Sequence, residues 1–302
     1  MTAAAVAALT GLVVLWASAF PAIKLGLEGL SPGHLTLARH LVASMAFVPF
    51  LVAFRARLLP RLTDLPALLG LGFVGITTYH FALNTGEQRV SAGATSLIIA
   101  TVPALTAAIA WFVTGDRLGR LGWLGTALGL LGVTLIVAGD GPAALGLSLE
   151  PYSAFILLAA LATAFFAVLQ RPVLRRYRPL EFTAFVTWAG TLPMLVFLPG
   201  FSAALAEAGR TPLLATLHLG LFPSAVAYTL FAYSLSRAPA TLVTAWLYLI
   251  PGFALLFSWW WLGEVPNALT LVGGAVVVCG VVLVNVSKRR RGAAVSPVVA
   301  VR

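Results

Sequence analysis

The sequence predicts an all-α integral membrane protein with ten transmembrane helices, arranged as two inverted five-helix repeats. Three observations carry this prediction. The composition is too apolar for a water-soluble domain, ten apolar stretches are each long enough to cross a bilayer, and an internal repeat contains an odd number of those stretches.

The composition sets the class of protein. Of 302 residues, 60% are hydrophobic and only 9% are charged, whereas soluble domains carry roughly 25% charged residues. A bilayer allows such an apolar exterior, so membrane lipid is an expected partner. The net charge of +10 comes from short basic clusters between apolar runs. Nucleic-acid binders instead spread basic residues along one face, so no nucleic-acid partner is expected.

The reactive side chains argue against enzyme chemistry. Cys279 is the only cysteine, which excludes a disulfide framework within one chain. The four histidines lie on different segments, and neither HExxH nor GxSxG occurs. We therefore expect no metal site, no cofactor and no enzymatic activity.

A helix needs about 20 apolar residues to cross the hydrocarbon core. Punctuating Pro, Gly and charged residues separate ten such stretches. The predicted spans are 3–23, 34–54, 66–86, 91–113, 119–138, 152–170, 181–199, 212–235, 240–262 and 266–286. The first stretch lacks a charged segment before it and is long enough to span, which favours a transmembrane helix over a cleaved signal.

The distribution of Lys and Arg predicts the orientation. With both termini cytoplasmic, the inside segments hold 15 basic residues and the outside segments hold 3. Basic residues accumulate on the cytoplasmic side, so an even number of spans with both termini inside fits the count.

The second half of the chain echoes the first at an offset of 148 residues. Arg89, Pro103, Trp111 and Gly115 recur as Arg237, Pro251, Trp259 and Gly263. A repeat with five spans must cross the membrane in opposite directions in its two copies, as in many secondary transporters. The predicted units are a first repeat (1–138), an outside connecting loop (139–151), a second repeat (152–286) and a basic cytoplasmic tail (287–302).

These motifs resemble the drug/metabolite transporter superfamily, ten-span EamA type. The likeness rests on WASAFPAIK at 16–24, Ala38-Arg39, SAGAT at 91–95, Gly115-Asp116 and the spaced glycines that recur in the second half. It covers nearly the whole chain, and within the family it is strongest to the bacterial aromatic amino-acid exporters. The family usually has Glu where this chain has Asp116. The resemblance implies metabolite export across a bacterial cytoplasmic (inner) membrane.

Polar and aromatic side chains in the spans indicate a binding cavity, because such groups are costly at membrane depth. Thr77, His80, Asn84 and Glu87 follow one helix face at steps of 3, 4 and 3. Hydrogen bonding between helices is the alternative role for each hydroxyl or amide. The expected substrate-binding residues are Trp16, Thr77, Tyr79, His80, Asn84, Thr163, Phe166, Gln170, Tyr228, Thr244, Trp246 and Tyr248. Arg39 and Glu87 are assigned gating or structural roles.

No acid, Lys or Arg lies at the middle of a span, which favours a neutral or zwitterionic substrate such as an amino acid. Export of drugs or other metabolites, and a non-transporting membrane scaffold, are the alternatives. His80 is the group that could carry a proton near neutrality, so proton coupling and uniport both stay open.

The matched prolines Pro103 and Pro251 are expected to bend their helices and act as hinges. The glycine-rich spans 119–138 and 266–286 should pack at the periphery, either as scaffold or as a dimer face. A monomer and a homodimer are both compatible with that pattern.

Overall fold

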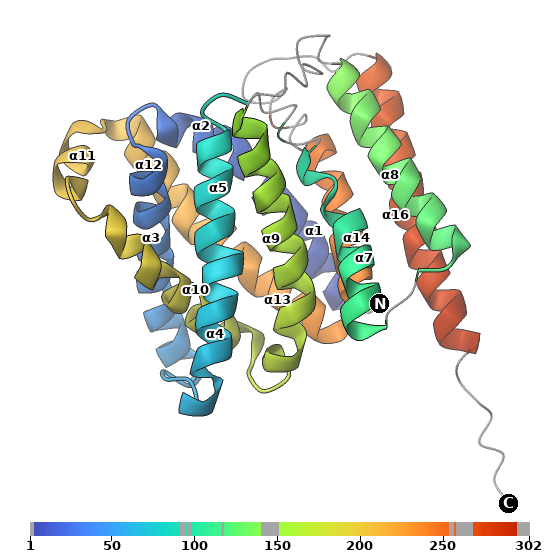
Figure 1. The fold of residues 1–302 in the computed structure, drawn as a ribbon, viewed down its shortest axis with the longest axis horizontal. Coiled ribbons are helices and arrows are strands. Elements are labelled where there is room, and N and C mark those ends of the chain that lie inside the picture. Colours follow the sequence, from blue (N-terminus) through green and yellow to red (C-terminus); the bar gives the residue numbers. More distant parts are fainter. Residues whose placement is uncertain are drawn as a thin grey trace, which may run out of the picture.

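The computed structural model describes residues 3–90, 95, 98–115, 118–139, 151–253, 257 and 268–294 (Figure 1). All regular structure in these ranges is helical, and a described helix falls in each of the ten predicted stretches. Within the described ranges, six helical segments are long and apolar enough to cross a membrane, and three shorter apolar helices accompany them. The prediction of an all-α, multi-pass membrane fold is confirmed.

The elements follow the repeat along the chain. The first half contains α1 (Ala3–Ala17), α2 (Ala19–Leu27), α3 (Pro32–Ala53), η1 (Leu62–Asp64), α4 (Leu65–Gly72), η2 (Phe73–Thr78), α5 (Tyr79–Gly86), α7 (Val102–Thr114) and α8 (Arg120–Gly139). The second half contains α9 (Pro151–Leu174), α10 (Pro179–Met194), η3 (Leu195–Phe197), α11 (Phe201–Glu207), α12 (Arg210–Leu219), η4 (Gly220–Ala227), α13 (Tyr228–Arg237), α14 (Ala240–Ala245), η5 (Trp246–Leu249) and α16 (Ala268–Ala294).

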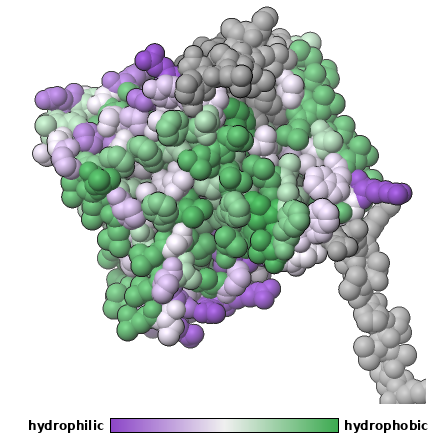
Figure 2. Space-filling model, in the orientation of Figure 1, coloured by the Kyte–Doolittle hydropathy of each residue, from purple (hydrophilic) through white to green (hydrophobic). Residues whose placement is uncertain are grey.

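The outer surface is apolar between two polar ends. Figure 2 shows a hydrophobic band across the bundle, with hydrophilic side chains gathered above and below it. Large apolar side chains such as Met45, Phe112 and Val196 are more than two-thirds exposed on this surface. Lipid tails can cover such side chains without the cost that water would impose, so the band marks the membrane-facing belt.

Two π-helical segments occupy equivalent places in the two halves. Residues 73–78 of η2 and 221–226 within η4 are related by the offset of 148. The span from α4 to α5 rises in Figure 1, whereas its counterpart from α12 to α13 descends. η2 packs against α10 of the second half, and η4 packs against α3 of the first half. Each π-helical segment therefore contacts the equivalent helix of the other half. These two equivalent crossings therefore run in opposite directions through the bundle.

Glycines allow the two crossings to approach closely. A Cβ on Gly72 would lie 2.5 Å from the backbone N of Gly190, and one on Gly220 would lie 2.6 Å from Cβ of Val42. Gly72 and Gly220 are repeat mates, as are Val42 and Gly190. Only a residue without a side chain fits at these contacts.

Helices α8 and α16 form an antiparallel pair at the edge of the bundle (Figure 1). Gly125 faces Gly280, and Gly132 faces Gly273, so each repeat contributes the same two positions. Small residues let two helix backbones approach, which explains the glycine-rich composition of both helices.

The two prolines follow breaks in their helices. Ala100 and Thr101 form a turn before Pro103, which then lies in the first turn of α7. The 3₁₀ segment Trp246–Leu249 precedes Pro251 at the equivalent place. Proline lacks the N–H of an interior helical residue but is tolerated in a first turn, so the helix restarts there.

One end of the bundle, which we call the arginine-rich end, carries the loops at 54–61 and 175–178. A polar clamp joins the two halves there. Asp64 Oδ2 accepts a hydrogen bond from Tyr177 Oη at 2.7 Å, and Asp64 forms a salt bridge with Arg176. The Tyr177 oxygen also accepts from the backbone N of Arg61 at 3.0 Å. Burial and the hydrogen bond to Asp64 raise the pKa of Tyr177, which keeps this phenol a donor.

Several predicted features lie outside the described residues. These are residues 140–150 of the connecting loop, Asp116, Gly263 and the tail from residue 295. Helix α16 continues to Ala294, beyond the predicted end of its span at residue 286.

Candidate functional site

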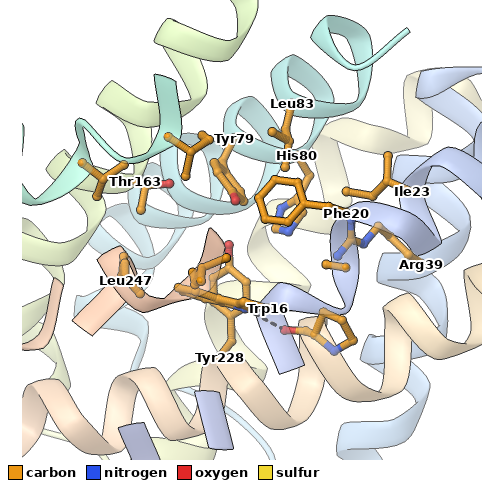
Figure 3. Close-up of a pocket in the computed structure, with 15 residues that line it drawn as sticks. Trp16, Phe20, Ile23, Arg39, Tyr79, His80, Leu83, Thr163, Tyr228 and Leu247 are labelled. Atoms are coloured by element: carbon orange, nitrogen blue, oxygen red, sulfur yellow. Dashed lines mark hydrogen bonds between the residues drawn. The ribbon is translucent and has the colours of Figure 1, made fainter. Parts of the chain in front are cut away.

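A cavity lies in the interior of the bundle, between the two repeats (Figure 3). It holds about 520 Å³ of empty space, which includes space open to solvent. Helices α1, α2, α3, α5, α7, α9, η4, α13 and η5 contribute side chains to its wall.

Pairs of repeat mates line this cavity together. Ile99 and Leu247 both line it, as do His80 and Tyr228, and each pair is separated by 148 residues. Ile99 directly precedes the turn before Pro103, and Leu247 lies in the 3₁₀ segment before Pro251. The breaks therefore place equivalent side chains of the two halves against one site, as expected for an inverted repeat.

Aromatic rings form one side of the wall. Trp16 Nε1 donates a hydrogen bond to the carbonyl oxygen of Pro223 at 3.2 Å. The Trp16 ring packs on Tyr228 with ring centroids 5.2 Å apart, and the Tyr228 hydroxyl donates to the carbonyl oxygen of Gly75 at 3.4 Å. These bonds use backbone carbonyls of the two π-helical segments, so the segments help to hold the aromatic wall in place.

Two imidazoles stand side by side next to these rings. His80 Nδ1 bonds the carbonyl oxygen of Ile76 at 2.9 Å, and His40 Nδ1 bonds that of Thr36 at 2.8 Å. The ring centroids of His40 and His80 are 4.3 Å apart. A carbonyl oxygen can only accept, so Nδ1 is the donor in both rings and Nε2 of the neutral ring is an acceptor.

Arg39 reaches the cavity from α3. Its side chain is 2% exposed, and its Nε donates a hydrogen bond to Ser224 Oγ at 3.2 Å. Figure 3 shows the guanidinium turned toward His80 and the middle of the cavity. Arg39, for which the sequence analysis predicts a gating or structural role, is part of the cavity wall.

Five of the twelve expected substrate-binding residues line the cavity: Trp16, Tyr79, His80, Thr163 and Tyr228. The other seven do not. Two of these make bonds between helices, since Thr77 Oγ1 donates to Gly190 O at 2.6 Å and Asn84 Nδ2 donates to Thr36 Oγ1 at 2.8 Å.

The remaining five lie behind the wall or away from it. Phe166 packs on Gly75 and Tyr228. Thr244 Oγ1 bonds the carbonyl oxygen of Ala240 in its own helix at 2.9 Å. Tyr248 packs on Gly129 of α8, while Trp246 Nε1 and the amide of Gln170 are buried without a hydrogen-bond partner among the described residues.

Sequence reasoning missed much of the apolar wall. The missed residues are Ala19, Phe20, Ile23, Leu83, Ile99, Val102, Pro223, Leu247 and Ile250. A signal existed for the first three, because they follow Trp16 at steps of 3, 4 and 7 and so share its helix face. Apolar residues alone do not distinguish a cavity from lipid.

Glu87 lies near the cavity, at the end of α5. Its carboxylate is buried, and neither oxygen has a hydrogen-bond partner in the part of the chain that the structure describes. Lys24 Nζ donates instead to the backbone carbonyl oxygens of Glu87 and Val90, at 3.2 and 3.5 Å. Lys24 thus ties the end of α2 to the end of α5.

No group of three or more His, Cys, Asp or Glu side chains in the described ranges could hold a metal ion. The fold and the site together define a multi-pass membrane protein with a polar and aromatic cavity between its two repeats, and secondary transporters commonly bind their substrates at such a place.

The chain belongs to the EamA-like transporter family. Residues 3–138 and residues 151–286 each match that family, and the two matches are displaced by the same 148 residues as the internal repeat. The resemblance drawn from the motifs is confirmed.

Its relatives are transporters. The chain is 42% identical over 270 residues to the uncharacterized transporter YdfC of Bacillus subtilis, covering 89% of this chain and 87% of that protein. It is 38% identical over 281 residues to a protein of Streptantibioticus cattleyicolor named as a probable terminal-alkyne amino-acid exporter, covering 93% of each. A solved crystal structure at 18% identity matches with a TM-score of 0.78 over 96% of this chain and 99% of that one, which shows the fold alone.

Proposed function

We propose that the protein exports small neutral or zwitterionic metabolites, amino acids with apolar or aromatic side chains among them, by alternating access. The observation that carries this proposal is the cavity between the repeats. Its wall offers aromatic and aliphatic surface for a side chain and a few fixed polar groups for the rest of the substrate. The amino-acid exporter among the relatives supports the same substrate class.

The proposed location is the bacterial cytoplasmic membrane, with both termini in the cytoplasm. The arginine-rich end is then cytoplasmic, because basic loops accumulate on that side. An Escherichia coli relative at 28% identity is named as an uncharacterized inner membrane transporter, which fits this location.

The structure supports a specific alternating-access scheme. Leu83 lies three residues before the end of α5, and Ile23 lies four before the end of α2, so the cavity occupies the half of the bundle away from the arginine-rich end. The clamp between Asp64 and Tyr177 joins the two repeats at the arginine-rich end. We therefore interpret this conformation as closed toward the cytoplasm. Opening the clamp while the repeats rock at the glycine crossings would expose the cavity to the cytoplasm.

The test is flux of labelled neutral amino acids, phenylalanine included, through proteoliposomes with and without an imposed pH gradient. Saturable flux without a gradient supports uniport of this substrate class. Flux that needs a gradient supports proton coupling and directs attention to His80 and Glu87. If no amino acid moves under either condition, the proposal fails, and export of drugs or other metabolites and the scaffold role become the leading alternatives.

A further inference from the structure

We propose that Arg39 binds the anionic group of the transported compound, so that the substrates share a carboxylate. This inference rests on the proposed function and deepens it. The argument uses the burial of Arg39, the direction of its guanidinium and the identity of the side chains around it.

Burial makes the charge of Arg39 costly. The side chain is among the largest fully buried ones in the described part of the protein, and it lies on α3, seven residues after the helix begins at Pro32. An ionised group removed from water is favourable only where an opposite charge or several hydrogen bonds compensate it. Buried basic residues within membrane spans are for this reason usually tied to function.

The protein compensates this charge only in part. Nε donates to Ser224 Oγ, while Nη1 is buried with no hydrogen-bond partner among the described residues. A guanidinium has five N–H donors in a planar fork that matches a carboxylate. The bond to Ser224 fixes the plane of this fork on one edge, and Nη1 still lacks an acceptor.

Among the described residues that line the cavity, none has a carboxylate side chain. The polar lining residues other than Arg39 are Trp16, Tyr79, His80, Thr163 and Tyr228, and none of them is an acid. Glu87 is close enough to act on Arg39 electrostatically, but no ion pair joins them among the described residues. Among the described residues no carboxylate lies at bonding distance from Arg39, which leaves this place for the anionic group of a ligand.

The surroundings of Arg39 suit a compound with an anionic head and an apolar body. Figure 3 places the guanidinium on one side of the cavity and the rings of Phe20, Trp16 and Tyr228 next to it and across from it. A carboxylate on the guanidinium would direct an attached side chain toward these rings. The carboxylate then supplies the orientation, and the rings supply apolar contact.

The experiment compares acids with their amides on the purified full chain. The probes are phenylalanine against phenylalaninamide and 3-phenylpropionate against 3-phenylpropanamide, together with the acid and amide of every amino acid that the flux assay shows to be moved. A charge-assisted bond should favour each acid by about 10- to 100-fold in Kd over its amide. This comparison needs no variant, so it does not depend on whether a substituted protein folds.

Variants then locate the preference. Arg39→Gln should bring the acid-to-amide ratio close to one, and Arg39→Lys should keep part of it, because lysine retains the charge without the fork. Lys24→Gln is the matched control. Its Nζ bonds backbone carbonyl oxygens and does not line the cavity, so its ratio should equal that of the wild type.

Each result bears on one level of the argument. A wild type that moves amino acids but binds acid and amide equally overturns the assignment of Arg39 and leaves the proposed function standing. An Arg39→Gln variant that binds ligand with the full acid preference also overturns the assignment. A wild type that neither binds nor moves any of the acids overturns both.

Discussion

The close approach of α4 and α10 gives the sharpest test of the packing. Gly72 is buried at the end of α4, just before the π-helical segment η2. A Cβ at this position would lie 2.5 Å from Gly190 N and 2.8 Å from Val186 O. Ordinary contact begins near 3.4 Å, so Gly72→Ala requires the two helix backbones to separate by roughly 0.9 Å. Because both obstructing atoms belong to the backbone, no side-chain rotation can relieve the clash.

The expected cost follows from overpacking. Inserting a methyl group into a close-packed contact costs about 1–3 kcal/mol. The matched control is Gly70→Ala, two residues earlier in the same helix, where a Cβ meets nothing within 4 Å. That change gains helix propensity, by up to about 1 kcal/mol. The same gain applies to Gly72→Ala, so the difference between the two variants isolates the clash.

The measurement is thermal unfolding of both purified variants in one detergent, followed by helical circular dichroism. We expect Gly70→Ala to melt at or above the wild-type temperature and Gly72→Ala to melt several degrees lower, at about 2–4 °C per kcal/mol. Equal melting temperatures for the two variants would refute the close approach. If the crossing is also a pivot, Gly72→Ala should slow flux in the protein that remains folded.

Three further predictions concern the clamp and the cavity. Tyr177→Phe removes a hydrogen-bond donor from the buried carboxylate of Asp64 and should lower the free energy of unfolding by about 1–3 kcal/mol. The control Tyr233→Phe should leave the free energy of unfolding unchanged, and equal losses in the two variants would contradict the clamp. Trp16→Phe loses an interhelical hydrogen bond in the cavity wall and should weaken substrate binding about 2- to 10-fold, while Trp123→Phe on the exposed surface should leave the Kd unchanged. His80→Ala should abolish saturable flux at unchanged expression, and full transport by this variant would remove His80 from the site.

Much of the fold could be predicted because its signals are local. Transfer of a side chain into lipid is decided residue by residue, so the run of apolar residues in each span predicts a helix without knowledge of its neighbours. The repeat could be found because Pro, Trp, Arg and spaced Gly recur at one offset. The matched prolines predict that two helices are interrupted, but the π-helical segments were not predicted, since backbone irregularity of that kind depends on contacts with other helices.

The candidate site shows the limit of such reasoning. Thr77 and Asn84 share the polar face of His80, yet they bond Gly190 and Thr36 on neighbouring helices. A helix face is about 100° wide, and periodicity cannot say which part of it meets a cavity and which part meets another helix.

The sequence by itself determined the class of protein, the positions of the spans, the repeat and the family. Each of these depends on composition, apolar length or recurring motifs along the chain. Only the tertiary structure decided which side chains share the cavity, and it places Arg39 in the cavity wall. The reason is that the partner of Arg39, Ser224, comes from the other repeat, 185 residues away. Contacts at such separation follow from the rotation and crossing of whole helices, which local patterns do not fix.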